Sequence, residues 1–156
     1  METLYFREIE SPLGPLTLMG TKEGLREVVY GRFTTKRDRS KNLILAEKQL
    51  NAYFKGSLKE FTVPLDLIGT PFQLKVWNEL EKIPYGQTCS YLDIAKGIGD
   101  PKAVRAVGGA NGRNPVPIIL PCHRVIGKLG RLIGYSGGVN KKIRLLELEG
   151  AILDLA

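Results

Sequence analysis

Three short apolar stretches rich in β-forming residues come first in the chain, and proline or glycine turns separate them. They are LYFREIES (4–11), GPLTLMGT (14–21) and GLREVVYGRF (24–33). Stretches of this kind predict a small antiparallel meander. The charged segment TTKRDRSK (34–41) that follows them is expected to be a loop.

A helical period replaces this pattern in the next segment. Its apolar positions are Leu43, Ala46, Leu50 and Phe54. Residues at this spacing share one face of a helix, so they predict a helix over about residues 42–55 that Gly56 ends. The segment 61–69 reads as a strand-like exit and a linker. We therefore expect a first domain over residues 1–68.

The helix signals are clearer from Thr70 onward. Thr70 and Gln73 form the pattern of a capping box, with Pro71 at the first helical position. The apolar positions Phe72, Val76, Leu80 and Ile83 follow at helical spacing. Pro84 and Gly86 are expected to end this helix.

Two further short helices are predicted on either side of the turn GIGDP (97–101). Ser90 can cap the first, and Pro101 is expected to begin the second, which runs through Val104 and Val107. Two short helices joined by a glycine-containing turn form the helix-turn-helix pattern. We expect a second domain over residues 69–156.

The last part of the chain combines an unusual proline-rich segment with a closing helix. NPVPIILPCHRVIG (114–127) contains too many prolines for a long helix and is apolar enough to be a buried, extended support. VNKKIRLLELEG (139–150) predicts an amphipathic helix, whose inward positions are expected to be Val139, Ile143 and Leu146.

Composition and charge narrow the function. The chain has 156 residues, 43% of them hydrophobic, and a formal net charge of +7. A basic chain with Lys102 and Arg105 on the second helix of a helix-turn-helix favours a DNA-binding protein. No apolar run is long enough for a membrane span and the N-terminus lacks a signal peptide pattern, so we expect a cytoplasmic location, or a nuclear one in a eukaryote. No dimerisation element is evident, so a monomer is expected.

The segment PCHRV (121–125) contains the only histidine and one of two cysteines. Three interpretations compete: a pair of metal ligands, a structural coincidence, and a nucleophile with its base. One histidine and two scattered cysteines fall short of a closed zinc site, so no metal is expected. An imidazole could accept the thiol proton, and Arg124 would favour the thiolate. Neighbouring residues in an extended chain point to opposite sides, so a water molecule or a bend would be needed. Glu147 and Glu149 are candidate partners for the imidazole.

Several motifs together resemble the O6-alkylguanine-DNA alkyltransferases. They are IPYGQTCSY (83–91), PKAVRAVGGANGRNPVPI (101–118), PCHRV (121–125), GYSGG (134–138) and LELEG (146–150), whereas the first 68 residues match loosely through SPLGPLTL (11–18). The resemblance implies an α+β fold, with a small RNase H-like N-terminal α/β region and a winged helix-turn-helix C-terminal domain. It also implies direct reversal of DNA damage: the alkyl group of O6-alkylguanine, and of O4-alkylthymine, passes irreversibly to a cysteine of the protein after base flipping.

The family's roles fall on matching positions of this chain. The resemblance makes Cys122 the alkyl acceptor and gives catalytic roles to His123, acting through a water, Glu149 and Tyr91, which would protonate or hydrogen-bond the leaving guanine. The DNA-binding positions it implies are Lys102, Arg105, Ala106, Gly108, Arg113 and Asn114. Arg105 would fill the gap left by the extruded base, and Asn114 would be the hinge before the cysteine segment. The pocket positions it implies are Asn114, Val125, Tyr135 and Ser136.

Partners and departures follow from the same resemblance. The expected partner is double-stranded DNA containing O6-alkylguanine, with no cofactor, no metal and no membrane. The zinc site that some relatives carry near the N-terminus cannot be built, because His123 is the only histidine. Ile133 and Gly134 make the pocket wall bulkier than a glycine-rich one, which would narrow the alkyl groups accepted. Cys89 is interpreted as a structural thiol.

Other classes of protein share parts of this pattern. A module that binds alkylated DNA without repairing it would not need Cys122. A helix-turn-helix regulator would need a dimer and a sequence-specific site. A cysteine hydrolase would need an oxyanion hole and turnover, and no basic DNA-reading helix.

Overall fold

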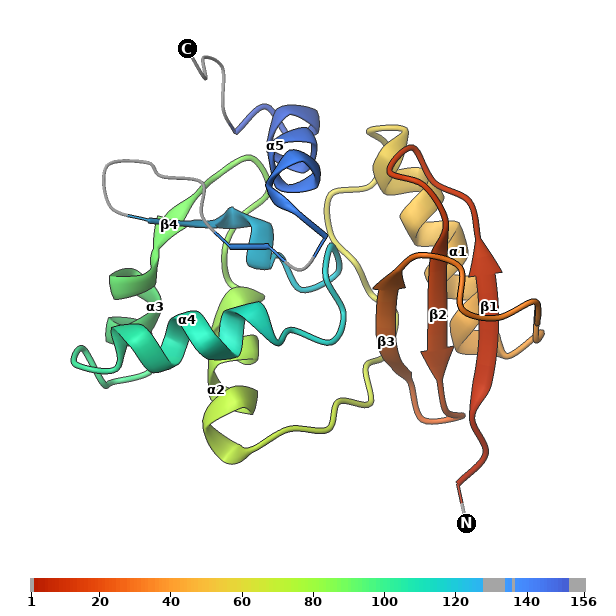
Figure 1. The fold of residues 1–156 in the computed structure, drawn as a ribbon, viewed down its shortest axis with the longest axis horizontal. Coiled ribbons are helices and arrows are strands. Elements are labelled where there is room, and N and C mark those ends of the chain that lie inside the picture. Colours follow the sequence, from red (N-terminus) through yellow and green to blue (C-terminus); the bar gives the residue numbers. More distant parts are fainter. Residues whose placement is uncertain (1, 128–133, 136, 152–156) are drawn as a thin grey trace. The chain divides into compact units, whose positions relative to one another are not determined.

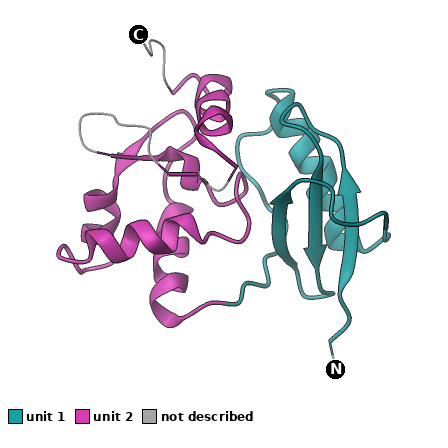
Figure 2. Ribbon diagram, viewed as in Figure 1, with its two compact units in different colours: residues 1–68 teal, residues 69–156 magenta. Residues whose placement is uncertain are grey.

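The computed structural model describes residues 2–127, 134–135 and 137–151. The chain divides into two compact units, residues 1–68 and residues 69–156 (Figure 2). The first contains a small sheet and one long helix, and the second is mainly helical (Figure 1). The expected α+β class is therefore confirmed. Ser136, one of the expected pocket residues, and Ile133 lie outside the described residues.

The sheet of the first unit is an antiparallel meander. Its strands are β1 (Tyr5–Ile9), β2 (Leu16–Gly20) and β3 (Leu25–Tyr30), in the order β1-β2-β3. In the central strand Leu16 and Leu18 alternate with Thr17, so both leucines lie on one face of the sheet, and both are fully buried. The predicted meander is thus present.

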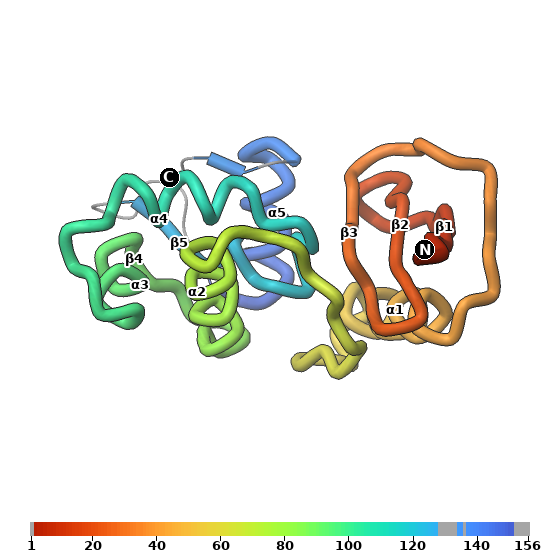
Figure 3. Tube along the Cα trace, turned by 90° about the horizontal axis from the view of Figure 1, so that it is seen from below, coloured from red at the N-terminus to blue at the C-terminus, as the bar shows by residue number. Residues whose placement is uncertain are grey.

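Helix α1 (Lys41–Phe54) packs against one face of this sheet (Figure 3). Its buried apolar residues are Leu43, Ala46, Leu50 and Tyr53. The expected stripe ended on Phe54, but Tyr53 is the core residue there, because a spacing of three from Leu50 points inward. Phe54 lies at the border of the face, with its ring edge-on to that of Tyr53.

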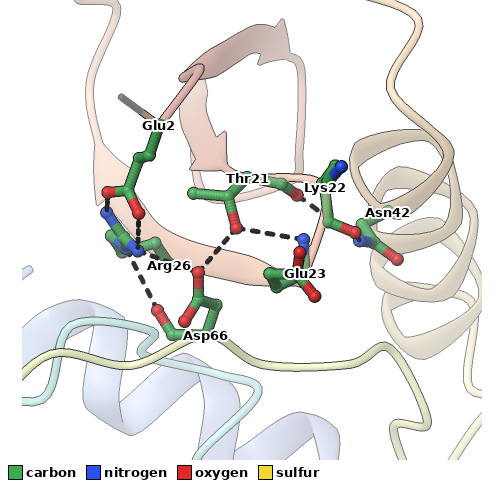
Figure 4. A network of polar contacts seen from close by, with 7 residues as sticks. All are labelled: Glu2, Thr21, Lys22, Glu23, Arg26, Asn42 and Asp66. Atoms are coloured by element: carbon green, nitrogen blue, oxygen red, sulfur yellow. Dashed lines mark hydrogen bonds and ion pairs between the residues drawn. The ribbon is translucent and has the colours of Figure 1, made fainter.

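The exit segment 61–69 runs beside β3 without forming a regular strand. Leu25 N–H donates to the Pro64 carbonyl and Asp66 N–H donates to the Leu25 carbonyl, each at 2.8 Å. A polar network fastens the same point (Figure 4): Asp66 Oδ2 accepts from Thr21 Oγ1 at 2.6 Å and from Arg26 Nη2 at 2.8 Å. Arg26 also pairs with Glu2. The backbone pairing of residues 64–66 with Leu25 agrees with the strand-like sequence pattern of the segment.

In the second unit, α2 (Pro71–Leu80) begins with the capping box that the sequence predicted. Thr70 accepts from the Gln73 N–H, and the Gln73 side chain accepts from the Thr70 N–H. Ser90 and Asp93 form another capping box at the start of α3 (Tyr91–Gly97). Trp77 of α2 donates its indole N–H to the Ala110 carbonyl at 2.8 Å.

Helix α4 (Val104–Gly112) begins later than expected. Pro101 was predicted to start it, but Ala103 N–H donates to the Asp100 carbonyl, which closes a separate turn. Helix α3, this turn and α4 form the helix-turn-helix (Figure 1). The second unit also contains two short parallel strands, β4 (Cys89–Ser90) and β5 (Val125–Ile126).

The closing helix is α5 (Val139–Leu148), and its buried residues are Lys142, Leu145 and Leu146. Of the expected inward positions only Leu146 is fully buried, whereas Val139 is exposed. The inner face therefore includes a lysine where the pattern suggested an apolar residue. None of the helices in the described part of the chain has the length and apolar content to cross a membrane.

Candidate active site

Cys122 lies in a single 3₁₀ turn, Cys122–Arg124, directly before β5. Its side chain is almost fully buried, and Arg124 N–H donates to the Pro121 carbonyl at 2.9 Å to close the turn. The sequence predicted an extended segment here. The turn instead supplies the bend that neighbouring cysteine and histidine side chains need in order to act together.

The segment before the cysteine is compact because its prolines are part of tight turns. Leu120 N–H donates to the Val116 carbonyl at 3.0 Å, and Ile118 between them has a φ of 76°. Positive φ is strained for a β-branched residue, and such strain persists only where the surroundings hold it. Ile118 is 1% exposed, so packing of its side chain fixes the turn that presents Cys122.

The His123 side chain is fully buried and bonded on one side. Its Nε2 lies 2.7 Å from Glu149 Oε2, whereas Nδ1 has no hydrogen-bond partner among the described residues. A carboxylate only accepts hydrogen bonds, so Nε2 carries the proton and Nδ1 presents a lone pair. Burial lowers the pKa of His123 from its ordinary value, with the Glu149 hydrogen bond acting in the opposite direction. The imidazole is therefore a neutral base.

Glu149 is held by several donors at once. Arg124 binds it through two nitrogens, with Nε at 2.8 Å from Oε1 and Nη2 at 2.9 Å from Oε2. Gly86 N–H donates to Oε1 at 3.3 Å. Gly86 has a φ of 81°, and a β-carbon there would lie 3.2 Å from the Glu149 carbonyl oxygen, so glycine is needed on both counts. Of the two predicted imidazole partners the structure selects Glu149, because Glu147 is exposed.

The Arg124 guanidinium pairs with the Glu149 carboxylate and not with the Cys122 thiol. Its third contact is Nη1 to the Ile83 carbonyl at 2.7 Å, which fastens the turn to the end of α2. The sequence interpretation that Arg124 favours the thiolate is therefore wrong. Lys142 instead supplies the positive charge that acts on the thiol, and this charge acts to lower the pKa of Cys122.

Lys142 is a functional candidate that the sequence reasoning missed. Its side chain is fully buried, and Nζ donates to the carbonyls of Val125 at 2.7 Å and Gly134 at 3.4 Å. Burial lowers the pKa of Lys142 to about 8. A lysine in an amphipathic helix is ordinarily assigned to the exposed face. Only its spacing of three and four residues to Leu145 and Leu146 could have indicated that it points inward.

The Cys122 thiol holds its proton at neutral pH in this environment. Burial raises the pKa of Cys122 to about 11, against the opposing effects of a hydrogen bond from Asn114 and the charge of Lys142. Asn114 is buried and locked in place: its Nδ2 donates to the Leu120 carbonyl at 2.7 Å, and its Oδ1 accepts from Val116 N–H at 3.0 Å. Thiolate formation at neutral pH therefore requires a base.

Tyr91 begins α3 and lies close to the same thiol. Its ring is in contact with α4, because a β-carbon at Gly108 would lie 4.0 Å from two of its ring carbons. Burial raises the pKa of the Tyr91 phenol, and the negative charge of a Cys122 thiolate raises it further. The structure thus places Tyr91 near Cys122 and joins His123 to Glu149, whereas the catalytic roles of these four residues stay a prediction.

The other expected site residues fall into separate groups. Lys102, Arg105, Ala106 and Arg113 are exposed on or beside α4, whereas Gly108 faces Tyr91 and Asn114 faces the cysteine turn. The Val125 side chain is fully buried, and Tyr135 is partly exposed. Cys89 is half-buried in β4, and burial raises the pKa of its thiol to about 11, so its interpretation as a structural thiol stays a prediction. No group of three potential metal ligands lies together in the described ranges.

Comparisons with known proteins match both units. Residues 71–151 match the family described as 6-O-methylguanine DNA methyltransferase, DNA binding domain, and residues 3–67 match its ribonuclease-like domain. The chain is 49% identical over 155 residues to a methylated-DNA–protein-cysteine methyltransferase of Methanosarcina acetivorans, covering 95% of this chain and 99% of that protein. A constitutive Bacillus subtilis protein of the same name is 44% identical, with coverage of 93% and 94%. The crystal structure of Mycobacterium tuberculosis OGT in complex with DNA is similar, with a TM-score of 0.83, 52% identity and coverage of 94% and 92%.

Proposed function

Because the chain belongs to the 6-O-methylguanine DNA methyltransferase family, we propose that it repairs O6-alkylguanine in duplex DNA by transferring the alkyl group to Cys122. The observation that carries this proposal is the buried thiol beside a neutral imidazole whose other nitrogen is fixed by Glu149. The relatives named above are methylated-DNA–protein-cysteine methyltransferases, and one solved neighbour binds DNA.

The first step is activation of the thiol. The lone pair on His123 Nδ1 accepts the Cys122 proton through one bridging water. Glu149 holds the imidazole in the tautomer that makes Nδ1 the acceptor and stabilises the imidazolium once formed. Lys142 and Asn114 stabilise the thiolate, since both act to lower the pKa of Cys122.

The second step is the alkyl transfer. The thiolate attacks the alkyl carbon in line, a sulfur–carbon bond forms, and the electron pair of the carbon–O6 bond passes to guanine. Tyr91 donates its phenolic proton to a ring nitrogen, so that guanine leaves as a neutral base. The imidazolium then returns a proton to the tyrosinate through solvent, which balances the protons.

The reaction needs the damaged base outside the helix stack. An edge atom of a base cannot be reached inside a duplex, so the nucleotide rotates into the pocket. Helix α4 exposes Arg105 and Ala106, and a basic side chain inserted into the stack can fill the vacated space. Lys102 and Arg113 at the two ends of α4 bind phosphates.

The protein acts once per molecule. The product is a thioether, and neither guanine nor water displaces a thiolate from an unactivated carbon. The same chemistry extends to O4-alkylthymine, because thymine also leaves as a neutral base when a ring nitrogen is protonated. Tyr135 lines the pocket rim in this scheme.

Peptide mass mapping tests the proposal. The protein is incubated with a duplex carrying O6-methylguanine, and in parallel with one carrying O4-methylthymine. We expect one methyl group on the peptide that contains Cys122 and unmodified guanine in the DNA. Methyl on Cys89, or DNA from which the damaged base has been excised, would contradict the proposal.

A further inference from the structure

Asn111 occupies the inner face of α4, between the nucleophile and Tyr91. It is 5% exposed and lies three residues, about one helical turn, after Gly108. The Tyr91 ring lies against Gly108 on this same face of the helix. Gly108, against which the Tyr91 ring lies, and Asn111 are thus neighbours on one face of α4.

The Asn111 amide nitrogen makes two contacts. Nδ2 donates a long hydrogen bond of 3.5 Å to the Cys122 carbonyl. A hydrogen bond from the Asn111 side chain also lowers the pKa of the Tyr91 phenol, against the larger effect of burial. An N–H donor to the phenolic oxygen has this effect because it favours the tyrosinate, and the second Nδ2 hydrogen is available for that contact. Asn111 Oδ1 has no partner among the described residues.

A phenol carries one proton, whose direction depends on its neighbours. When an N–H donates to the phenolic oxygen, it occupies a lone pair and the O–H must point elsewhere. We propose that Asn111 is a positioning residue that directs the Tyr91 hydroxyl proton away from α4 and toward the guanine, which departs from the alkyl carbon as Cys122 binds it. The inference deepens the proposed function and rests on it, since it assumes that Tyr91 protonates guanine.

Asn111 also assists Tyr91 after the proton has moved. The carbon–O6 bond breaks, its electron pair stays on guanine, and the Tyr91 proton neutralises that charge. The tyrosinate left behind is buried, and the Asn111 N–H stabilises it until the His123 imidazolium supplies a proton through solvent. An apolar side chain at position 111 would provide neither the orientation nor this stabilisation.

The test compares two methyl donors that differ in whether the leaving group needs a proton. O6-methylguanine in an oligonucleotide requires protonation of the departing base, whereas methyl iodide releases iodide and requires none. Asn111→Leu keeps the size of the side chain and removes the amide. Methylation of Cys122 by each donor is followed by peptide mass. Asn42→Leu is the matched control, because Asn42 is a buried asparagine of the first unit that donates to the Thr21 and Lys22 carbonyls (Figure 4).

We expect Asn111→Leu to slow transfer from O6-methylguanine by about tenfold or more, within the range for general acid catalysis, and to leave the methyl iodide reaction within twofold. In a Tyr91→Phe background the same substitution should have no further effect on transfer. Asn42→Leu should leave both rates unchanged.

The possible failures are distinguishable. If Tyr91→Phe does not slow transfer, the proposed role of Tyr91 fails and the inference fails with it. If Tyr91→Phe slows transfer but Asn111→Leu does not, only the inference is overturned. A faster reaction of Asn111→Leu would show that the amide carbonyl faces Tyr91 and holds its proton back. Equal losses with both donors would show a damaged thiol site.

Discussion

At the scale of single residues, Glu149 determines the arrangement around Cys122. It accepts from His123, from two nitrogens of Arg124 and from the Gly86 amide. A buried charge of this kind is stable only when it is paired and its remaining lone pairs are bonded. The same carboxylate therefore neutralises Arg124 and fixes the imidazole, which is its catalytic task in the proposed function.

Glu149→Gln keeps the size of the side chain and removes its negative charge. It leaves the Arg124 charge buried without a counter-ion, which costs about 3 kcal/mol or more of the free energy of unfolding. It also replaces one carboxylate oxygen by an NH2 donor and removes the negative charge that stabilises the imidazolium, so transfer should slow by about a hundredfold or more. Urea unfolding and the single-turnover rate measure the two effects. Glu147→Gln, an exposed neighbour on α5, should change neither, and an equally active Glu149→Gln would rule out the assigned role.

The neutral state of His123 gives the protein a defined pH dependence. Its pKa is lowered in the folded state, so below its ordinary value of about 6.5 the unfolded chain binds a proton that the folded chain does not. The contribution to stability is complete above that pH and is lost as the pH falls through the lowered value. We expect the free energy of unfolding to fall as the pH is lowered from about 6.5, the ordinary histidine pKa, to about 5. This fall should be steeper in the unsubstituted protein than in His123→Asn. Parallel curves for the two proteins would contradict this.

Residue chemistry could be predicted from the sequence only where the letters themselves are distinctive. PCHRV pointed to the candidate thiol and imidazole, and the capping pattern at Thr70 located a helix. Lys142 and Asn111 were missed because a polar residue within a helix is ordinarily assigned to the exposed face. Their importance comes from burial, which depends on tertiary packing and not on local pattern.

At the scale of elements, α4 combines a packed inner face with an exposed face of small residues. Gly109 and Gly112 are exposed, and a β-carbon at Gly109 would only touch the end of the Arg113 side chain. Internal packing thus does not require glycine at these positions. Close approach of another molecule would require it, because a helix face without side chains can lie deeper in a groove.

Gly109→Leu should therefore have opposite effects on stability and on DNA binding. Leucine is a better helix former than glycine, so the free energy of unfolding should rise by about 0.5–1 kcal/mol. The added side chain should weaken binding to duplex DNA at least tenfold. Denaturation and a fluorescence anisotropy titration report these separately. Unchanged affinity would show that this face of α4 does not enter a groove.

Arg105→Ala tests the role of α4 in base extrusion. If Arg105 fills the gap left by the flipped nucleotide, its loss should slow repair in a duplex at least tenfold. The reaction with the same base in a single strand should change little, because no stack has to be opened. Single-turnover rates on both substrates measure the difference. Equal losses on both would indicate a defect of the pocket or the fold.

Element boundaries were less predictable than element identities. The sequence predicted the meander, α1, α2 and the helix-turn-helix, but it placed the start of α4 at Pro101 and an extended segment before Cys122. In both places a local turn intervenes, closed by Ala103 N–H to Asp100 and by Leu120 N–H to Val116. The second of these turns contains the positive φ of Ile118, which side-chain patterns do not reveal.

At the scale of the whole molecule, all the groups assigned to the chemistry belong to the second unit, residues 69–156. The turn at Cys122 is joined to α2 through Ile83 and to the end of α5 through Glu149. An added alkyl group would have to fit among these packed contacts. Nothing in this arrangement provides a group that could remove it from the sulfur, so the account requires that each chain reacts once.

The most direct test of the central claim is the amount of repaired DNA plotted against protein concentration, with O6-methylguanine duplex in excess. Irreversible transfer to Cys122 predicts a burst that ends at one repaired base per active chain, hence a line of slope near one. Cys122→Ser should repair nothing while still binding DNA, since serine is similar in size but far less acidic. Continued product formation after the burst, at more than one repaired base per chain, would show a catalyst that turns over and would contradict the account.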